Sequence, residues 1–90
     1  MSFSVSYTEK FLDDLKKHKK SGQKLLLSKA ERFINECFEN PRIGTGKPEQ
    51  LKHRTIETWS REINKQHRLV YEIESENVLM LSAWGHYNDK

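Results

Sequence analysis

The chain has 90 residues, a formal net charge of +3, a hydrophobic fraction of 34% and a charged fraction of 32%. This length allows one domain, residues 1–90, without a second hydrophobic core. No apolar run approaches the roughly 18 residues of a membrane-spanning helix, and the N-terminal residues lack the basic-then-apolar order of a signal peptide. The single Cys37 excludes an intramolecular disulfide and a multi-cysteine metal site. We therefore expect a cytoplasmic protein that binds no cofactor or metal and contacts no membrane.

The first twenty-two residues predict a strand followed by a helix. Phe3, Val5 and Tyr7 alternate with serines, which is the period of a half-buried strand. Ser6 or Thr8 can cap the helix that follows, with Glu9 placed for a capping box on Ser6, and Gly22 can end it. The apolar side of this helix consists of Phe11, Leu12 and Leu15. We expect His18 to be exposed because it lies within a run of lysines, residues 16–20.

A second helix is predicted up to Asn40-Pro41. Proline disfavours helical geometry in the residue before it, so the helix should end there. Its apolar residues recur at spacings of three and four: Leu26, Ala30, Phe33, Ile34, Cys37 and Phe38. Cys37 is therefore expected to pack in the core rather than to act as a nucleophile.

After a glycine-bearing loop over residues 43–48, the pattern changes to that of strands. Trp59, Arg61 and Ile63 alternate with Ser60 and Glu62. Residues 69–73 form a nearly continuous apolar run, as expected of a central strand, and residues 78–84 form a further strand. Turns are expected at 64–66 and 74–77. The order predicts an α+β fold, with two N-terminal helices packed on a small, mostly antiparallel sheet.

Basic residues predominate between positions 42 and 68. This stretch contains seven basic residues and three acidic ones. The basic residues are Arg42, Lys47, Lys52, Arg54, Arg61, Lys65 and Arg68, and the acidic residues are Glu49, Glu57 and Glu62. A basic surface attracts polyanions such as nucleic acids, although a solvated charged face explains the same bias. The lysine run at residues 16–20 needs no function, since cations are favourable at a helix C-terminus.

Several residues of the last third could together cut RNA. Attack by the RNA 2′-hydroxyl on the neighbouring phosphate needs a base, an acid and cations that stabilise the negative charge. Candidates for proton transfer are Glu49 and His86, and candidates for the charge are Arg68, Arg61 and Lys52. Tyr87 could stack on a base or donate a hydrogen bond to phosphate. Taken singly, Glu49 is also explained as a solvated loop residue and His86 as a surface group. His53 and His67 are alternative proton carriers, and Trp59 and Trp84 are expected in the core or on a sheet face.

Four ordered motifs in this region resemble one known family. They are Gly46-Lys47-Pro48-Glu49-x-Leu51-Lys52, Trp59-Ser60-Arg61-x-Ile63, His67-Arg68-Leu69-Val70-Tyr71 and His86-Tyr87. The chain is similar in these motifs, in register from about residue 44 to residue 87, to the Txe/YoeB toxins of the RelE superfamily. The resemblance implies the RelE-like fold of small bacterial ribonuclease toxins. It also implies a toxin of a type II toxin–antitoxin pair that inhibits translation as a metal-independent endoribonuclease, cutting mRNA in the ribosomal A site.

The resemblance also implies roles for individual residues. Glu49 would be the general base, Arg68 would stabilise the transition state, His86 would be the general acid and Tyr87 would help to position the substrate. Contacts with phosphate or ribosomal RNA are implied for Lys52, Arg61, Lys47 and His53.

The implied partners are a YefM/Phd-like antitoxin, whose C-terminal segment covers the active site, and mRNA on the ribosome, with contacts to 16S rRNA. Operator DNA would be bound only through the antitoxin complex, and a homodimer is compatible with the sequence. The chain departs from the family pattern at three places. Glu62 stands where a second arginine is common, Trp84 stands where many members carry a basic residue, and residues 88–90 continue beyond the His-Tyr pair.

Two other functions fit parts of the sequence. The first is a binding module on the same fold without nuclease activity, such as a gyrase-directed ParE-like toxin. The second is a plain RNA- or DNA-binding protein, which explains the basic region but not the terminal His-Tyr. The joint presence of Glu49, Arg68, His86 and Tyr87 favours the nuclease.

Overall fold

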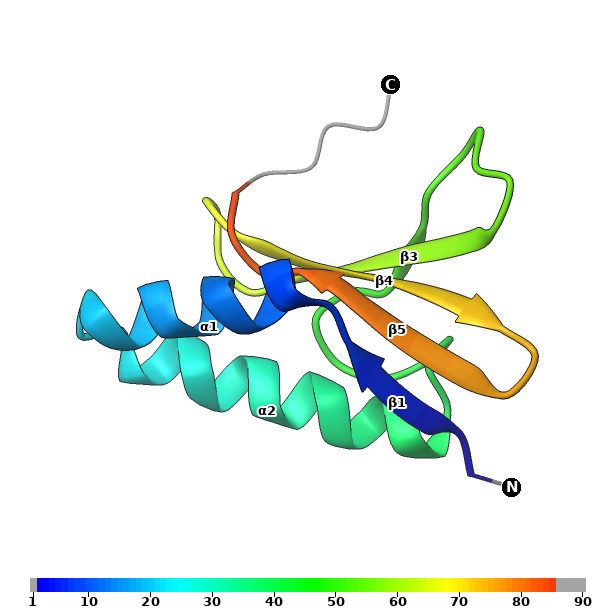
Figure 1. Cartoon of the computed structure of the whole chain (residues 1–90), viewed down its shortest axis with the longest axis horizontal. Coiled ribbons are helices and arrows are strands. Elements are labelled where there is room, and N and C mark those ends of the chain that lie inside the picture. The colour runs from blue at the N-terminus through cyan, green and yellow to red at the C-terminus, as the bar shows by residue number, and fades with distance from the viewer. Residues whose placement is uncertain (1, 86–90) are drawn as a thin grey trace.

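The computed structural model describes residues 2–85, which form two helices and one sheet. In chain order, the elements are β1 (Ser4–Tyr7), α1 (Glu9–Lys20), α2 (Lys24–Glu39), β2 (Glu49–Gln50), β3 (Glu57–Glu62), β4 (Arg68–Glu74) and β5 (Asn77–Ser82). Both helices lie on the same side of the sheet (Figure 1). The predicted α+β fold, with two N-terminal helices packed on a small sheet, is confirmed.

The five strands are arranged in the order β1-β5-β4-β3-β2. The pairs β2–β3, β3–β4 and β4–β5 are antiparallel, whereas β1 runs parallel to β5. The sheet is therefore mixed and mostly antiparallel. A parallel neighbour needs a long connection, and here the chain between β1 and β5 contains both helices and the other three strands. The two-residue strand β2, which the sequence pattern did not predict, forms one edge and carries Glu49.

The first helix begins at a threonine cap. Thr8 Oγ1 accepts the backbone N–H of Phe11 at 3.1 Å, so Thr8 is the cap and the capping box predicted on Ser6 does not form. The Ser6 hydroxyl instead donates to Asn77 Oδ1 at 3.1 Å. The second helix ends at Glu39, immediately before Asn40-Pro41, as the proline rule predicted.

The hydrophobic core lies between the helices and the inner face of the sheet. Its helical residues include Phe11, Leu26, Ala30, Phe33 and Cys37, and its strand residues include Leu69, Tyr71, Ile73, Val78 and Met80. The prediction that Cys37 packs in the core is confirmed, because its side chain is fully buried. Trp59 is partly buried and packs against the same cluster.

Two predictions for α1 are wrong. Leu12 is 45% exposed, and His18, which was expected on the surface, is fully buried. The reason is helical spacing: His18 follows Phe11 by seven residues, or about two turns, and so shares its face. Asp14, between them, is buried as well. Nε2 of His18 donates to the Ala83 carbonyl at 2.7 Å, whereas its buried Nδ1 has no hydrogen-bond partner among residues 2–85.

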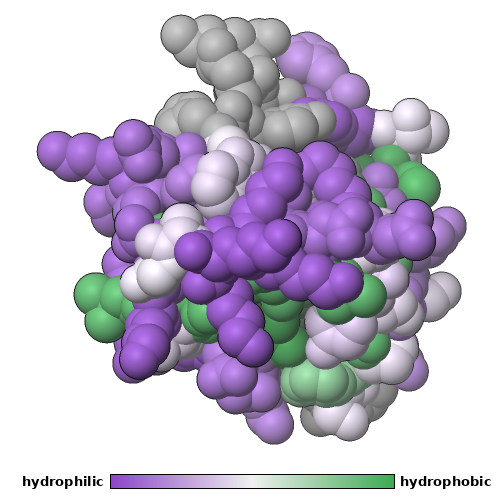
Figure 2. Space-filling model, turned by 60° about the vertical axis from the view of Figure 1, so that its left-hand side comes forward, coloured by the Kyte–Doolittle hydropathy of each residue, from purple (hydrophilic) through white to green (hydrophobic). Residues whose placement is uncertain are grey.

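The surface seen in Figure 2 is mostly hydrophilic, and its hydrophobic residues form separate patches. Large exposed apolar side chains include those of Leu25 and Ile43. Among residues 2–85, neither helix has the length and apolar character that crossing a membrane requires.

Candidate active site

The sheet has an outer face, opposite the helices, on which the candidate residues meet. In β3, Trp59 and Arg61 point toward the helices, since Trp59 packs on the core and Arg61 pairs with Glu36 of α2. Side chains alternate along a strand, so Thr58 and Ser60 belong to the outer face. Ser60 lies opposite Glu49 in the β2–β3 register and opposite Val70 of β4.

Glu49 and Arg68 are brought together on this outer face. Glu49 Oε1 lies 3.6 Å from Arg68 Nη2. The Glu49 side chain is 70% exposed, whereas that of Arg68 is only 14% exposed. Arg68 Nε also donates to Ser60 Oγ at 3.2 Å. A carboxylate open to solvent thus stands beside a covered guanidinium whose orientation is fixed by a neighbouring strand.

The backbone of Arg68 also contacts the end of the described chain. The Arg68 N–H donates to the Gly85 carbonyl at 3.0 Å, and the Gly85 N–H donates to His67 Nδ1 at 2.9 Å. His86 and Tyr87, two of the predicted catalytic residues, lie outside the described residues. Their neighbour in the sequence, Gly85, is held directly beside Arg68.

Arg61 lies on the other side of the sheet from Glu49 and Arg68. Its guanidinium is fully buried and donates to Tyr71 Oη at 2.9 Å and to Glu36 Oε1. It also donates to the carbonyls of Pro41, Ile43 and Thr45. Phosphate would have to displace these internal acceptors to reach it. The donors of Arg61 are therefore used within the fold and are not presented to the outer face.

The electrostatics around Arg61 agree with a structural ion pair. Burial alone would lower the pKa of Arg61, but the Tyr71 hydroxyl and the Glu36 carboxylate together raise it. Burial also acts to raise the pKa of Glu36, and the hydrogen bonds from Thr45 and Arg61 outweigh it, so the Glu36 pKa lies below its ordinary value. Both groups are thus charged at neutral pH.

The remaining predicted RNA contacts, Lys47, Lys52 and His53, are exposed. Lys47 lines a small hollow of about 200 Å³ with Lys29 and Glu62, and Glu62 is the residue opposite Arg68 in the β3–β4 register. Lys52 and His53 are exposed in the segment between β2 and β3. A recess of about 340 Å³ is lined by His53, Arg54, Thr55, Ile56, Thr58, Glu72 and Leu81.

Two residues of the site were not predicted from the sequence. Ser60 orients Arg68, and its place on the outer face follows from the alternation with Trp59 and Arg61 that the sequence displays. The sequence indicates His67 only as an alternative proton carrier. Its ring accepts the N–H of Gly85, and no pattern in the sequence indicates this contact.

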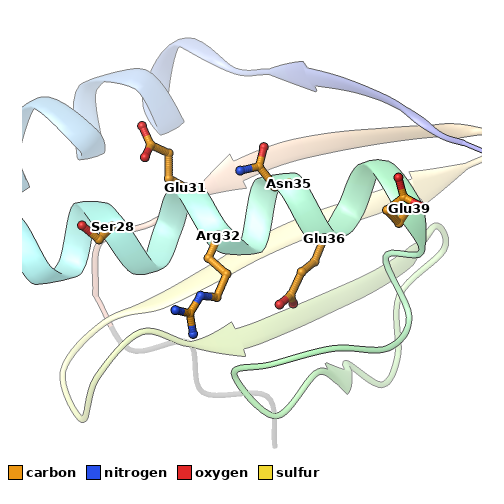
Figure 3. A pocket seen from close by; sticks show the side chains of 6 residues that line it. All are labelled: Ser28, Glu31, Arg32, Asn35, Glu36 and Glu39. Atoms are coloured by element: carbon orange, nitrogen blue, oxygen red, sulfur yellow. The ribbon is translucent and has the colours of Figure 1, made fainter.

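A further hollow, of about 450 Å³, lies along the exposed side of α2. Its lining side chains all project from that one helix (Figure 3): Ser28, Glu31, Arg32, Asn35, Glu36 and Glu39. Neither Glu49 nor Arg68 lines it.

Comparison with known proteins is consistent with this geometry. The family model described as "YoeB-like toxin of bacterial type II toxin-antitoxin system" matches residues 7–87. The chain is 36% identical over 87 residues to toxin YoeB of Mycobacterium bovis, covering 97% of this chain and 96% of that protein.

Solved structures agree in fold over nearly the whole chain. A YoeB/ParE toxin from Agrobacterium tumefaciens has a TM-score of 0.84 at 27% identity and covers 93% of this chain and 99% of its own. YoeB of Staphylococcus aureus has been solved as a dimer and in a heterotetrameric complex with YefM. These two structures have TM-scores of 0.81 and 0.78, and each is 27% identical and covers 97% of this chain and 100% of its own. The chain therefore belongs to the YoeB-like toxins of bacterial type II toxin–antitoxin systems.

Proposed function

We propose that this toxin is an endoribonuclease that cuts mRNA in the ribosomal A site and so inhibits translation. The observation that carries the proposal is the Glu49–Arg68 pair, 3.6 Å apart on the outer face. Arg68 in turn holds the backbone of Gly85, the residue before His86. The proposed base and the proposed cation thus lie side by side, and the residue before the proposed acid is bonded to the same arginine.

The reaction needs three functions that these side chains can supply. Glu49, as the general base, would take the proton of the 2′-hydroxyl, and the resulting oxygen would form a bond to phosphorus. The bond from phosphorus to the 5′-oxygen would break, and His86, as the general acid, would protonate that oxygen. The products are a 2′,3′-cyclic phosphate and a 5′-hydroxyl.

Arg68 is suited to stabilise the charge that develops on the phosphate. Its guanidinium is largely covered, and its orientation is fixed by Ser60 before substrate arrives. A preorganised donor in a water-poor place stabilises a transition state more than one in bulk water does. Tyr87 would position the substrate, and the exposed Lys52, Lys47 and His53 would contact RNA phosphates.

The proposed regulator is a YefM-like antitoxin that covers the active site. The S. aureus relative has been solved with YefM, which supports a partner of this kind. Operator DNA would then be bound only through the toxin–antitoxin complex. The dimer of the S. aureus relative supports a homodimer of this chain.

In-vitro translation of a defined message tests the proposal. The 5′ ends of the message would be mapped by primer extension after addition of the wild-type protein or of the variants His86→Ala and Arg68→Ala. Arg32→Ala, which removes an exposed arginine from α2, is the matched control. We expect cuts phased with codons that require ribosomes, persist in Arg32→Ala and weaken by about 10²–10⁴-fold in His86→Ala.

An intact message with unaffected translation would reject the nuclease. The same protein would then be assayed for inhibition of gyrase supercoiling, the activity expected of the alternative binding module. Cleavage of RNA without ribosomes at the same rate would keep the chemistry and reject the A site.

A further inference from the structure

The backbone at Gly85 is held on both sides by consecutive residues. The carbonyl of Gly85 accepts the N–H of Arg68 at 3.0 Å, and its N–H donates to Nδ1 of His67 at 2.9 Å. Arg68 is the proposed cation of the active site. The next residue in the chain is His86, the proposed general acid. Gly85 is therefore the point at which the acid is joined to the rest of the site.

Ala83 is held in the same way by α1. Its N–H donates to Asp14 Oδ2 at 2.9 Å, and its carbonyl accepts Nε2–H of His18 at 2.7 Å. Both α1 side chains are almost fully buried. Four hydrogen bonds thus fix the segment 83–85 at both ends. Three of them involve the side chains of Asp14, His18 and His67, and of these three side chains His67 is the one bonded to Gly85, the residue before His86.

His67 is itself rigidly placed. Its backbone N–H donates to Asn64 Oδ1 at 2.7 Å, and its carbonyl accepts the N–H of Ile63 at 3.0 Å. Its ring packs on the rings of His18 and Trp84, with centroids 4.8 and 4.4 Å apart. The turn and the two rings hold the imidazole so that Nδ1 faces Gly85.

We propose that His67 is a positioning residue for the cleavage reaction: by accepting the Gly85 N–H on Nδ1, it sets the point from which the chain continues into His86. The inference rests on the proposed function and adds a residue to it. His67 takes no proton in the reaction. It acts through the backbone by holding Gly85, the residue before the proposed general acid, against Arg68.

The proposal requires His67 to be unprotonated at Nδ1. A protonated ring would present an N–H to the Gly85 N–H, and two donors cannot bond. The titratable groups of the described chain that act on this ring include His18 and Asp14 of α1, and Lys17 of the same helix lies over the neighbouring Trp84 ring. Burial and the neighbouring His18 lower the pKa of His67 below 6.5, with Asp14 opposing. The contact therefore persists at neutral pH and is lost on acidification.

Two substitutions at this position separate positioning from packing. His67→Asn places an amide oxygen near the position of Nδ1 and keeps an acceptor that does not titrate. His67→Ala removes the acceptor. Both lose the ring contacts with His18 and Trp84, so both should lose similar thermal stability. Gln66→Ala, at an exposed position of the same turn, is the control.

Ribosome-dependent cleavage rates and exchange of the Gly85 amide measured by NMR test the inference. We expect kcat to fall about 10²-fold in His67→Ala, the loss typical of a small misplacement of a reacting group, with KM little changed. In His67→Asn, kcat should stay within a few-fold of wild type. The Gly85 amide should be protected in wild type and His67→Asn and unprotected in His67→Ala. The loss of cleavage activity that the wild-type protein shows as the pH is lowered should be smaller in His67→Asn.

Equal losses of activity in the two variants, following their loss of thermal stability, would overturn the inference while leaving the nuclease in place. Absence of cleavage by the wild-type protein, with the Gly85 amide protected, would instead overturn the proposed function and retain only the contact.

Discussion

Arg61 and Glu36 form an ion pair that joins the sheet to α2, with the guanidinium fully buried and the carboxylate 27% exposed. The same guanidinium donates to backbone carbonyls between α2 and β2, namely those of Pro41, Ile43 and Thr45. This segment leads into the short strand that carries Glu49. A buried cation thus fixes the path of the chain toward the proposed base, although it lies on the opposite side of the sheet.

Replacement of Arg61 should destabilise the fold strongly. Arg61→Met removes the donor shared by three carbonyls, the Glu36 carboxylate and the Tyr71 hydroxyl, and we expect the free energy of unfolding to fall by about 3 kcal/mol or more. Urea unfolding followed by tryptophan fluorescence measures this. Arg32→Met, at an exposed position of α2, should change stability by no more than about 0.5 kcal/mol. A loss below about 1 kcal/mol in Arg61→Met would contradict the structural role.

The Glu36 carboxylate should make stability depend on pH in the acid range. Its pKa in the folded protein lies below the ordinary 4.5, so the folded state favours the charged form. Its contribution is complete above the unfolded pKa of about 4.5 and is lost as pH falls through the lower folded value. Thermal unfolding between pH 3 and 6 should show a shallower dependence in Glu36→Gln than in wild type. Glu39→Gln, on the same helix, should follow the wild-type curve, and identical curves for all three proteins would refute the assignment.

Gly46 should tolerate alanine less well than Gly22. Both glycines have positive φ, +80° and +75°, and the backbone strain of about 1 kcal/mol is common to both. A Cβ at Gly46 would lie 2.5 Å from Phe33 Cζ, whereas a Cβ at Gly22 meets nothing within 4 Å. We expect Gly46→Ala to cost about 1–3 kcal/mol more than Gly22→Ala, as measured by urea unfolding. Equal costs would mean that Phe33 moves aside freely.

Loss of the Ser60 hydroxyl should reduce cleavage without unfolding the protein. Ser60→Ala removes the acceptor of the Arg68 Nε–H, and a hydrogen bond to a charged group contributes about 1.5–3 kcal/mol. If part of this energy serves to orient the guanidinium in the transition state, the cleavage rate falls about tenfold. Single-turnover cleavage on ribosomes measures the effect. Ser28→Ala, on the exposed side of α2, is the control, and an unchanged rate in Ser60→Ala would show that Arg68 needs no such support.

The Cys37 thiol should be unreactive in the native protein. Burial raises its pKa from 9.0 to about 11, which by itself lowers the thiolate fraction about 100-fold at pH 8, and the side chain has no solvent exposure. Alkylation by iodoacetamide should therefore be at least about 100-fold slower in the native state than in urea. Native and unfolded rates within tenfold of one another would place Cys37 outside the core.

The sequence predicted the helices and the three long strands because each has several periods of its pattern. The same alternation that identified residues 59–63 as a strand also placed Arg61 with Trp59 and Ile63 on the buried face. The positive charge of Arg61, however, suggested a contact with phosphate. Burial of an arginine depends on acceptors from other segments, here Glu36, Tyr71 and three carbonyls, and these are not visible in the local pattern.

The other differences between the sequence predictions and the structure have similar causes. Strand β2 has two residues, too few to show a period, and it exists because Glu49 and Gln50 pair with β3. His18 was assigned from its lysine neighbours rather than from its spacing to Phe11, which places it on the buried face. The role of His67 depends on a contact with Gly85, 18 residues away, and only the folded chain brings these two together.

The parallel pairing of β1 with β5 has a consequence for the order of assembly during synthesis. Ser4 contacts Asn77 across 73 residues of chain, so the first strand to leave the ribosome stays without its neighbour until the last strand has emerged. Contacts at such separation slow folding because the intervening loop must close first. The chain is thus expected to complete its sheet only late in translation, after the helices have formed. Before that closure Gly85, which follows β5, is not yet held against Arg68, so the proposed site is incomplete until the sheet closes.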